Sequence, residues 1–188
     1  SKISSINLPE GLEKIGQAAF YACRLKEIWI PNSCQDLSGS TLFQQNYFLK
    51  RIHLPEGLDR IPNSLASACL KLQEVNIPSS VKSIGKTAFQ QCYSLKNIEL
   101  PNGLETIEKD AFWHCDSLEQ IVFPATLSLL GQECCSYMSG LRRIYCMATE
   151  PPVCVESTLN PGNTPFGDYE PVRHLSTPND IPVYVPVG

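Results

Sequence analysis

Residues 95–115, LKNIELPNGLETIEKDAFWHC, decide the fold because they repeat residues 72–92, LQEVNIPSSVKSIGKTAFQQC, at an offset of 23. The two stretches agree wherever a side chain would have to be buried and diverge at polar positions such as Lys82, which is matched with Glu105. The agreeing pairs are Leu72/Leu95, Val75/Ile98, Ile77/Leu100, Pro78/Pro101, Val81/Leu104, Ile84/Ile107, Ala88/Ala111, Phe89/Phe112 and Cys92/Cys115. A fixed period with constant apolar positions predicts a solenoid, in which each repeat buries its apolar face only against its neighbours.

The same pattern extends over most of the 188 residues. Related repeats begin at Ile3, Leu25, Leu49 and Leu118, and a seventh begins at Leu141 and breaks down at the sequence Glu-Pro-Pro of residues 150–152. We therefore predict about seven coils that form one elongated array.

Each repeat predicts the same succession of short elements. Residues 98–100, Ile-Glu-Leu, alternate as in a half-buried strand, and Pro101 ends it because proline cannot donate to the ladder. Residues 102–103, Asn-Gly, supply a turn, and a second extended piece follows at residues 104–107. Residues 109–115 have the spacing of one helical or 3-10 turn. We expect the strands of successive coils to form a parallel sheet.

A column of aromatic side chains is expected between the sheet and these turns, at Phe20, Phe43, Phe89 and Phe112. The third and sixth repeats carry Ala66 and Cys135 at this position, and these smaller side chains fill less of the core than a phenylalanine does. We predict looser packing in those two repeats unless neighbouring residues shift inward.

Nine cysteines are present, and most occupy repeat positions that predict burial. The position shared by Cys23, Cys69, Cys92 and Cys115 is typical of a small buried hydrophobic residue, and Cys34, Cys134 and Cys135 replace apolar residues of other repeats. The exceptions are Cys146 and Cys154, which flank the double proline. Either they are free thiols, or a disulfide between them closes a small loop.

Composition and charge exclude several classes of partner. Fifteen Lys and Arg against nineteen Asp and Glu give a net charge of −4, which argues against nucleic acid because that partner needs a basic stripe. No apolar run approaches the ~18–20 residues of a membrane span. The N-terminal residues SKISSINLP do not resemble a signal peptide and begin directly in a predicted strand, so we expect a fragment or mature portion of a longer chain.

The sequence contains no arrangement of side chains that predicts catalysis or metal binding. His53, His114 and His174 fall at unrelated positions, whereas a zinc site needs several ligands at close spacing. The thiols are expected to be buried, and no G-x-S-x-G, phosphate-binding or dinucleotide motif is present. We predict no enzymatic activity, no cofactor and no metal.

The outward face of the sheet is the candidate binding surface. Its outward column is predicted to contain one residue per strand: Asn7, Trp29, His53, Asn76, Glu99, Val122 and Tyr145. An aromatic and basic set of this kind is enriched at recognition sites, and the candidate ligand-binding residues are Trp29, Arg51, His53, Arg143 and Tyr145. The alternative is a solvated face carrying Glu27–Arg51–Glu74 charge pairs, which contribute little. Trp113 with His114, on the opposite edge, is a second exposed aromatic candidate.

The pattern L-x-x-I-x-L-P-x-x-L-x-x-I-G-x-x-A-F-x-x-C-x-x-L resembles the BspA-like leucine-rich repeats of bacterial surface and secreted proteins. The resemblance covers Ile3 to about Cys146, and residues 183–188, VYVPVG, are similar to the family's closing strand. It implies an α/β leucine-rich-repeat solenoid, mainly parallel β with short helical or 3-10 turns, over residues 1–146. Residues 147–188 would form a C-terminal capping segment with a long covering loop at residues 153–180. The apolar residues of the first coil would lie uncovered.

The resemblance and the extended surface together predict a non-catalytic interaction or adhesion module. It would bind an extracellular protein or a glycan through the sheet face, at the cell surface or after secretion, and we expect a monomer. The alternative is a structural spacer within a larger surface protein, with no ligand of its own.

Overall fold

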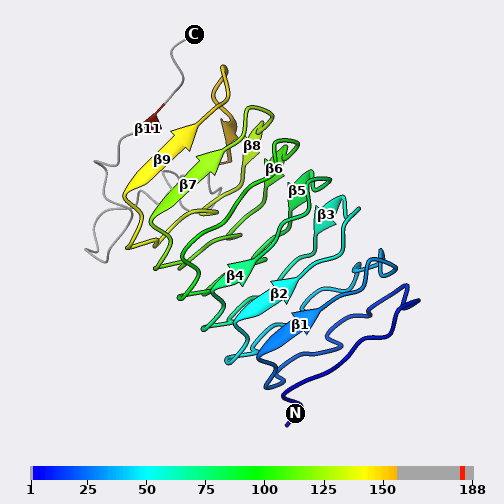
Figure 1. The fold of residues 1–188 in the computed structure, drawn as a ribbon. Coiled ribbons are helices and arrows are strands. Elements are labelled where there is room, and N and C mark those ends of the chain that lie inside the picture. Colours follow the sequence, from blue (N-terminus) through cyan, green and yellow to red (C-terminus); the bar gives the residue numbers. More distant parts are fainter. Residues whose placement is uncertain (1, 156–182, 185–188) are drawn as a thin grey trace.

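The computed structural model describes residues 2–155 and 183–184, and within them the chain winds into a solenoid of about six turns (Figure 1). The strands lie in two columns, with the front strands on one side of the coils and two-residue second strands on another. The front strands are β1 (Glu27–Trp29), β2 (Arg51–His53), β4 (Glu74–Val75), β7 (Gln120–Phe123), β9 (Arg143–Cys146) and β11 (Val183–Tyr184). The second strands are β3 (Arg60–Ile61), β5 (Ser83–Ile84), β6 (Thr106–Ile107), β8 (Leu129–Leu130) and β10 (Val153–Cys154).

The strands pair in parallel with the register that the repeat predicts. Ile28 of β1 is paired with Ile52 of β2, and Ile52 is paired in turn with Val75 of β4. The second strands form one five-stranded sheet in the order β10-β8-β6-β5-β3. The front strands form two sheets, β1-β2-β4 and β11-β9-β7, because residues 95–100 of the fifth coil form no strand between them (Figure 1).

The core consists of the residues that the repeat alignment identified, with one correction. Leu72, Val81, Ile84 and Phe89 have no exposed surface, and neither do their matches one repeat later. The four remaining apolar side chains of the front segments in the fourth and fifth coils are only partly buried: Val75, Ile77, Ile98 and Leu100. These side chains lie at or beside the interruption of the front sheet, so the coils that lack strand pairing there also bury their apolar side chains less completely.

The predicted helical turn of each coil is wrong, since the described residues contain no helix of any kind. Asp110 and His114 instead have positive φ angles of 55° and 59°, and residues at the same two positions have positive φ in the other coils: Ala18/Ala22, Thr41/Gln45, Ser64/Ala68, Thr87/Gln91 and Glu133/Tyr137. A left-handed conformation at a non-glycine residue costs roughly 1–2 kcal/mol. A compensating interaction is therefore required in every coil.

Hydrogen bonds between coils supply that compensation. The backbone N–H groups of Asp110, Phe112 and His114 donate to carbonyl oxygens of the next coil, at 3.0, 2.8 and 3.0 Å. The three equivalent N–H groups of the fourth coil, on Thr87, Phe89 and Gln91, donate to the fifth in the same way. A helix would have used these donors within its own segment, so the turn conformation creates a third backbone ladder along the solenoid.

The shared cysteine position adds a side-chain ladder beside this one. The thiols of Cys69, Cys92 and Cys115 donate to the carbonyl oxygens of Phe43, Ala66 and Phe89 of the preceding coil, at 3.1, 3.3 and 3.3 Å. In the second coil Asn46 occupies the position, and its Nδ2 donates to the carbonyl of Phe20 at 2.6 Å. The predicted burial of the cysteines at this repeat position is confirmed, and in four coils the side chain there also donates a hydrogen bond to the coil before it, whereas the sixth coil has the buried Met138 instead.

The phenylalanine column consists of two stacked pairs. The ring centroids of Phe20 and Phe43 are 5.6 Å apart, and those of Phe89 and Phe112 are also 5.6 Å apart. Ala66 interrupts the column, yet both Ala66 and Cys135 are fully buried. Burial therefore gives no sign of the looser packing predicted for the third and sixth coils.

The two ends of the array differ from its middle. Ile3 and Ile6 of the first coil are exposed, and Leu8, Leu12 and Phe20 are half-buried, as predicted for this coil. At the other end the seventh coil does not break down at residues 150–152. The chain bends at residues 149–150, just before the double proline, after which β10 pairs with β8 and continues the second strand column.

Part of the predicted C-terminal segment lies outside the described residues. This applies to residues 156–182, which include most of the expected covering loop, and to residues 185–188. β11 is described, and it pairs with β9 in the register Val183↔Ile144. The division into residues 1–146 and 147–188 stays a prediction. Among the described residues no helix is long and apolar enough to cross a membrane.

Replacing Phe89 by Ala should lower the free energy of unfolding by roughly 3–5 kcal/mol, because it leaves a cavity in a fully buried stacked pair. Denaturant melting measures the change. The matched control is Phe48→Ala, which removes a ring that is 43% exposed and should cost less than about 1 kcal/mol. Equal losses for the two variants would refute the assignment of Phe89 to the core.

Candidate binding surface on the front sheet

Trp29 and His53 form an aromatic platform on the outward face of β1 and β2. The ladder pairs these two residues directly, and their rings stack with centroids 3.4 Å apart and planes 8° from parallel. Trp29 remains 64% exposed, and among the large hydrophobic side chains whose burial the structure describes only that of Val153 is more exposed. The predicted proximity of Trp29 and His53 is confirmed. We call this stacked pair the Trp29 platform.

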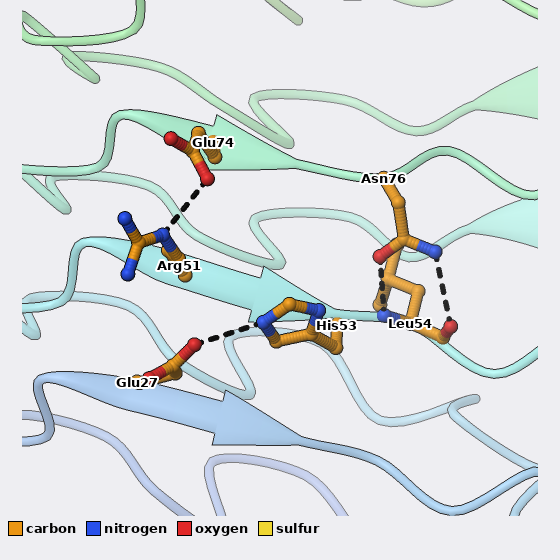
Figure 2. Close-up of polar contacts among 6 residues, drawn as sticks. All are labelled: Glu27, Arg51, His53, Leu54, Glu74 and Asn76. Atoms are coloured by element: carbon orange, nitrogen blue, oxygen red, sulfur yellow. Dashed lines mark hydrogen bonds and ion pairs between the residues drawn. The ribbon is translucent and has the colours of Figure 1, made fainter.

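A hydrogen bond to the strand below fixes the imidazole of the platform. His53 Nε2 lies 2.9 Å from Glu27 Oε1 (Figure 2). A carboxylate only accepts, so Nε2 carries the hydrogen of this bond. Because Glu27 and Trp29 both belong to β1, the strand that carries the indole also orients the ring stacked on it.

The ion pairs of this face differ in part from those predicted. Arg51 Nε donates to Glu74 Oε2 at 2.8 Å, as expected from their pairing in the ladder (Figure 2). This hydrogen bond raises the pKa of the Arg51 guanidinium. Glu27 is opposite Arg51 in the register but makes its contact with His53. The predicted Glu27–Arg51–Glu74 chain is therefore two separate pairs.

Asn76 has a structural role that sequence reasoning missed. The N–H of Leu54 donates to Asn76 Oδ1 at 2.8 Å, and Asn76 Nδ2 donates to the carbonyl of Leu54 at 3.2 Å (Figure 2). One side chain thus makes both hydrogen bonds that the ladder would make beyond Val75. Nothing in the repeat pattern distinguishes this asparagine from the other outward polar residues.

Beside the platform is a hollow of about 410 Å³ whose lining includes Trp29, His53, Glu10 and Glu56. Glu10, Asn32 and Glu56 each follow the proline that ends the front strand in the first, second and third coils. The backbone of Glu56 is held on both sides, because its N–H donates to Asn32 Oδ1 at 3.0 Å and its carbonyl accepts from Gln35 Nε2 at 2.7 Å. Sequence reasoning missed both glutamates, although their shared place after the proline could have indicated them.

The structure does not bring all five predicted site residues together. Trp29, Arg51 and His53 lie on the β1-β2-β4 sheet, whereas Arg143 and Tyr145 lie on β9 of the other front sheet. Tyr145 is half-buried and is paired with Val122, which is 41% exposed. The interruption in the fifth coil separates the two groups (Figure 1). Any ligand that touches both groups must span several coils.

Trp113 and His114 form a separate aromatic cluster on the side of the turns. The His114 ring contacts the rings of Trp113, Tyr137 and Tyr93, and its Nδ1 lies 3.2 Å from Asp116 Oδ1. Trp113 and His114 are half-buried, not exposed as predicted. The rings of this cluster cover part of one another's surface, so the cluster offers less exposed aromatic surface than the Trp29 platform.

The thiols provide no reactive centre on this surface. All nine are free, so Cys146 and Cys154 form no disulfide. Burial raises the pKa of the Cys69 thiol to about 12 and also raises the pKa values of the Cys92 and Cys115 thiols. They therefore stay protonated and able to donate. Among the described residues no group of three His, Cys, Asp or Glu side chains could hold a metal ion.

Parallel strands that pair at a spacing of 23 or 24 residues, with constant leucine and isoleucine positions facing inward, define a leucine-rich-repeat solenoid. The particular family follows from the sequence profile named "BspA type Leucine rich repeat region", of which six copies match residues 1–92 and 60–150. The chain belongs to this family. No curated protein matches the chain closely enough to count as a relative.

Several solved bacterial structures are similar to the chain. A leucine-rich repeat protein from Bacteroides ovatus is 29% identical, with a TM-score of 0.74, over 80% of this chain and 39% of its own. One from Eubacterium ventriosum is 28% identical, with a TM-score of 0.66, over 80% and 38%. The pneumococcal vaccine antigen PcpA shares the fold at 21% identity and a TM-score of 0.62, over 78% and 36%. The chain thus spans less than two fifths of these proteins' length.

Labelling of the native protein with a thiol reagent at neutral pH should modify only Cys154, because the other eight cysteines are buried. The reaction should be slow, since partial burial raises the pKa of the Cys154 thiol. Mass spectrometry should show one label in the native state and nine in denaturant, and Cys154→Ser should abolish native labelling. Seven labels in denaturant without reductant, and none before it, would instead indicate a Cys146–Cys154 disulfide.

Proposed function

We propose that this chain is a non-catalytic interaction module of a bacterial cell-surface or secreted protein. It binds a protein or a glycan through the outward face of the front sheet. The Trp29 platform is the observation that carries the proposal. A large indole, 64% exposed and fixed in place by its neighbours, is the kind of side chain that dominates binding energy at interfaces.

The rigidity of the platform supports this assignment. An exposed tryptophan on a loop would lose conformational freedom when it bound a partner. Here β1 holds the backbone, the imidazole stacks against the indole, and Glu27 holds the imidazole at 2.9 Å. Folding has already cost the side chains of the platform their conformational entropy, so a smaller part of the contact energy is lost to ordering them when a partner binds.

The shape of the molecule also favours binding over catalysis. Stacked front strands give an extended surface with one variable outward residue per coil, as in other solenoids that bind macromolecules. The hollows on this face are open and shallow enough for a protruding side chain or sugar, and they do not enclose a small substrate. Two solved structures that share the fold agree with a location outside the cell, since one is described as a leucine-rich cell surface protein from Faecalibacterium prausnitzii and the other as a pneumococcal vaccine antigen.

A structural spacer is the second candidate. Arg51 and Glu74 of the front sheet form an exposed ion pair, and such pairs are expected on a face that meets only water. The coils run as an elongated stack with the first coil and β9 at opposite ends (Figure 1). A stack of this form would hold neighbouring domains apart without any ligand.

Replacing both Trp29 and His53 by Ala should abolish ligand capture on arrays of glycans and extracellular proteins, because it removes the platform and its exposed indole. The matched control is Tyr93→Ala, which removes an exposed ring on the side of the turns and should leave capture unchanged. Thermal melting should confirm that both variants fold. Capture that survives the double substitution would contradict the assignment of this face, and no capture by the unmodified chain would favour the spacer.

A further inference from the structure

The hollow beside the Trp29 platform combines an open aromatic face with two unpaired carboxylates. Trp29 belongs to the second coil, and Glu10 and Glu56 line the hollow from the first and third coils. Both glutamates are exposed, and neither carboxylate makes a hydrogen bond or an ion pair with the residues that the structure describes. Coils stack about 4.8 Å apart, so the two glutamates are attached to the backbone at points roughly 10 Å apart, on either side of the indole.

The polar atoms that remain free around this hollow are mostly acceptors. Asn76 uses both its oxygen and its nitrogen on Leu54, and the oxygen of Asn32 accepts from the N–H of Glu56. His53 Nε2 is committed to Glu27. The remaining side-chain donors are the indole N–H of Trp29, the amide nitrogen of Asn32 and that of Asn7, against four oxygens from the two carboxylates.

The two glutamates also give the hollow a negative charge. The basic side chain closest along the front sheet is Arg51, and its guanidinium is bound to Glu74 at 2.8 Å. The negative charges of Glu10 and Glu56 are therefore not neutralised by a neighbour. A ligand that fits must be positive, rich in donors and able to lie against an indole.

We propose that the hollow takes an arginine side chain from a basic segment of a partner protein. A guanidinium carries five donors and no acceptor, pairs with carboxylates through two parallel hydrogen bonds, and stacks on aromatic faces. A pyranose ring could also stack on the indole, but it is neutral and its hydroxyl groups need donors as well as acceptors. A lysine offers a point charge without the flat surface. The inference rests on the proposed function and specifies the partner's chemistry at that same surface.

The test uses the whole chain and a flexible glycine–serine peptide that carries two arginines. The readout is the indole N–H signal of Trp29 in nitrogen-15 NMR, assigned by its persistence in Trp113→Phe, since the chain has two tryptophans. The arginine peptide should shift this signal. The same peptide with neutral citrulline should bind at least about tenfold more weakly, and so should the arginine peptide on a Glu10→Gln, Glu56→Gln double variant.

The matched control is Glu119→Gln with Glu150→Gln, which changes the net charge by the same amount at two exposed glutamates outside the hollow. Binding to this control should equal binding to the unmodified chain. Equal affinity for the arginine and citrulline peptides, or no binding of either, would overturn the inference. A shift of the Trp29 signal by maltohexaose with none by the arginine peptide would assign the platform to a neutral glycan.

The same variants separate this inference from the function on which it rests. Suppose a partner captured on the array is lost with Trp29→Ala and His53→Ala but retained at full strength by the Glu10, Glu56 double variant. The binding function would then stand, and the assignment of an arginine to the hollow would fall. If the array partner is lost with both pairs of substitutions, the two proposals are supported together.

Discussion

Hydrogen bonds between the backbones of successive coils are the constraint on which the rest of the structure depends. A coil of about 23 residues is too short to build a core of its own, so every apolar face is buried only when the next coil stacks in register. Three ladders impose that register: the front strands, the second strands and the turns with positive φ. The thiols of Cys69, Cys92 and Cys115 add a short fourth row of donors, from the third, fourth and fifth coils to the coil before each.

The same register builds the candidate site. Because the ladder sets Trp29 opposite His53, two residues 24 positions apart in the sequence become a stacked pair, and two glutamates from flanking coils reach the same hollow. Where the register fails on the front face, at residues 95–100, the surface is divided and the inward side chains are partly exposed. The candidate surface around Trp29 therefore lies within the first four coils.

Much of the fold could be predicted from sequence, because burial imposes a visible period on the apolar residues. The turn conformation could not, since Asp110 and His114 are ordinary residues whose positive φ is imposed by bonds to the next coil. The interruption of the front sheet was equally hidden, because Ile98 has the residue type of a buried strand. For the site, spacing predicted the contact of Trp29 with His53. The sequence could not reveal that Glu27 contacts the imidazole of His53 and not the guanidinium of Arg51, because side-chain geometry decides between these two partners.

Amide hydrogen exchange measured residue by residue in the fifth coil tests the central claim most directly. The N–H of Phe112 donates to the sixth coil at 2.8 Å, whereas residues 96–100 of the same coil make no backbone–backbone hydrogen bond within the described part of the chain. The account predicts that Phe112 exchanges only through global unfolding, several orders of magnitude more slowly than Ile98 and Glu99. Equal protection along the whole coil would contradict it, as would rapid exchange at Phe112.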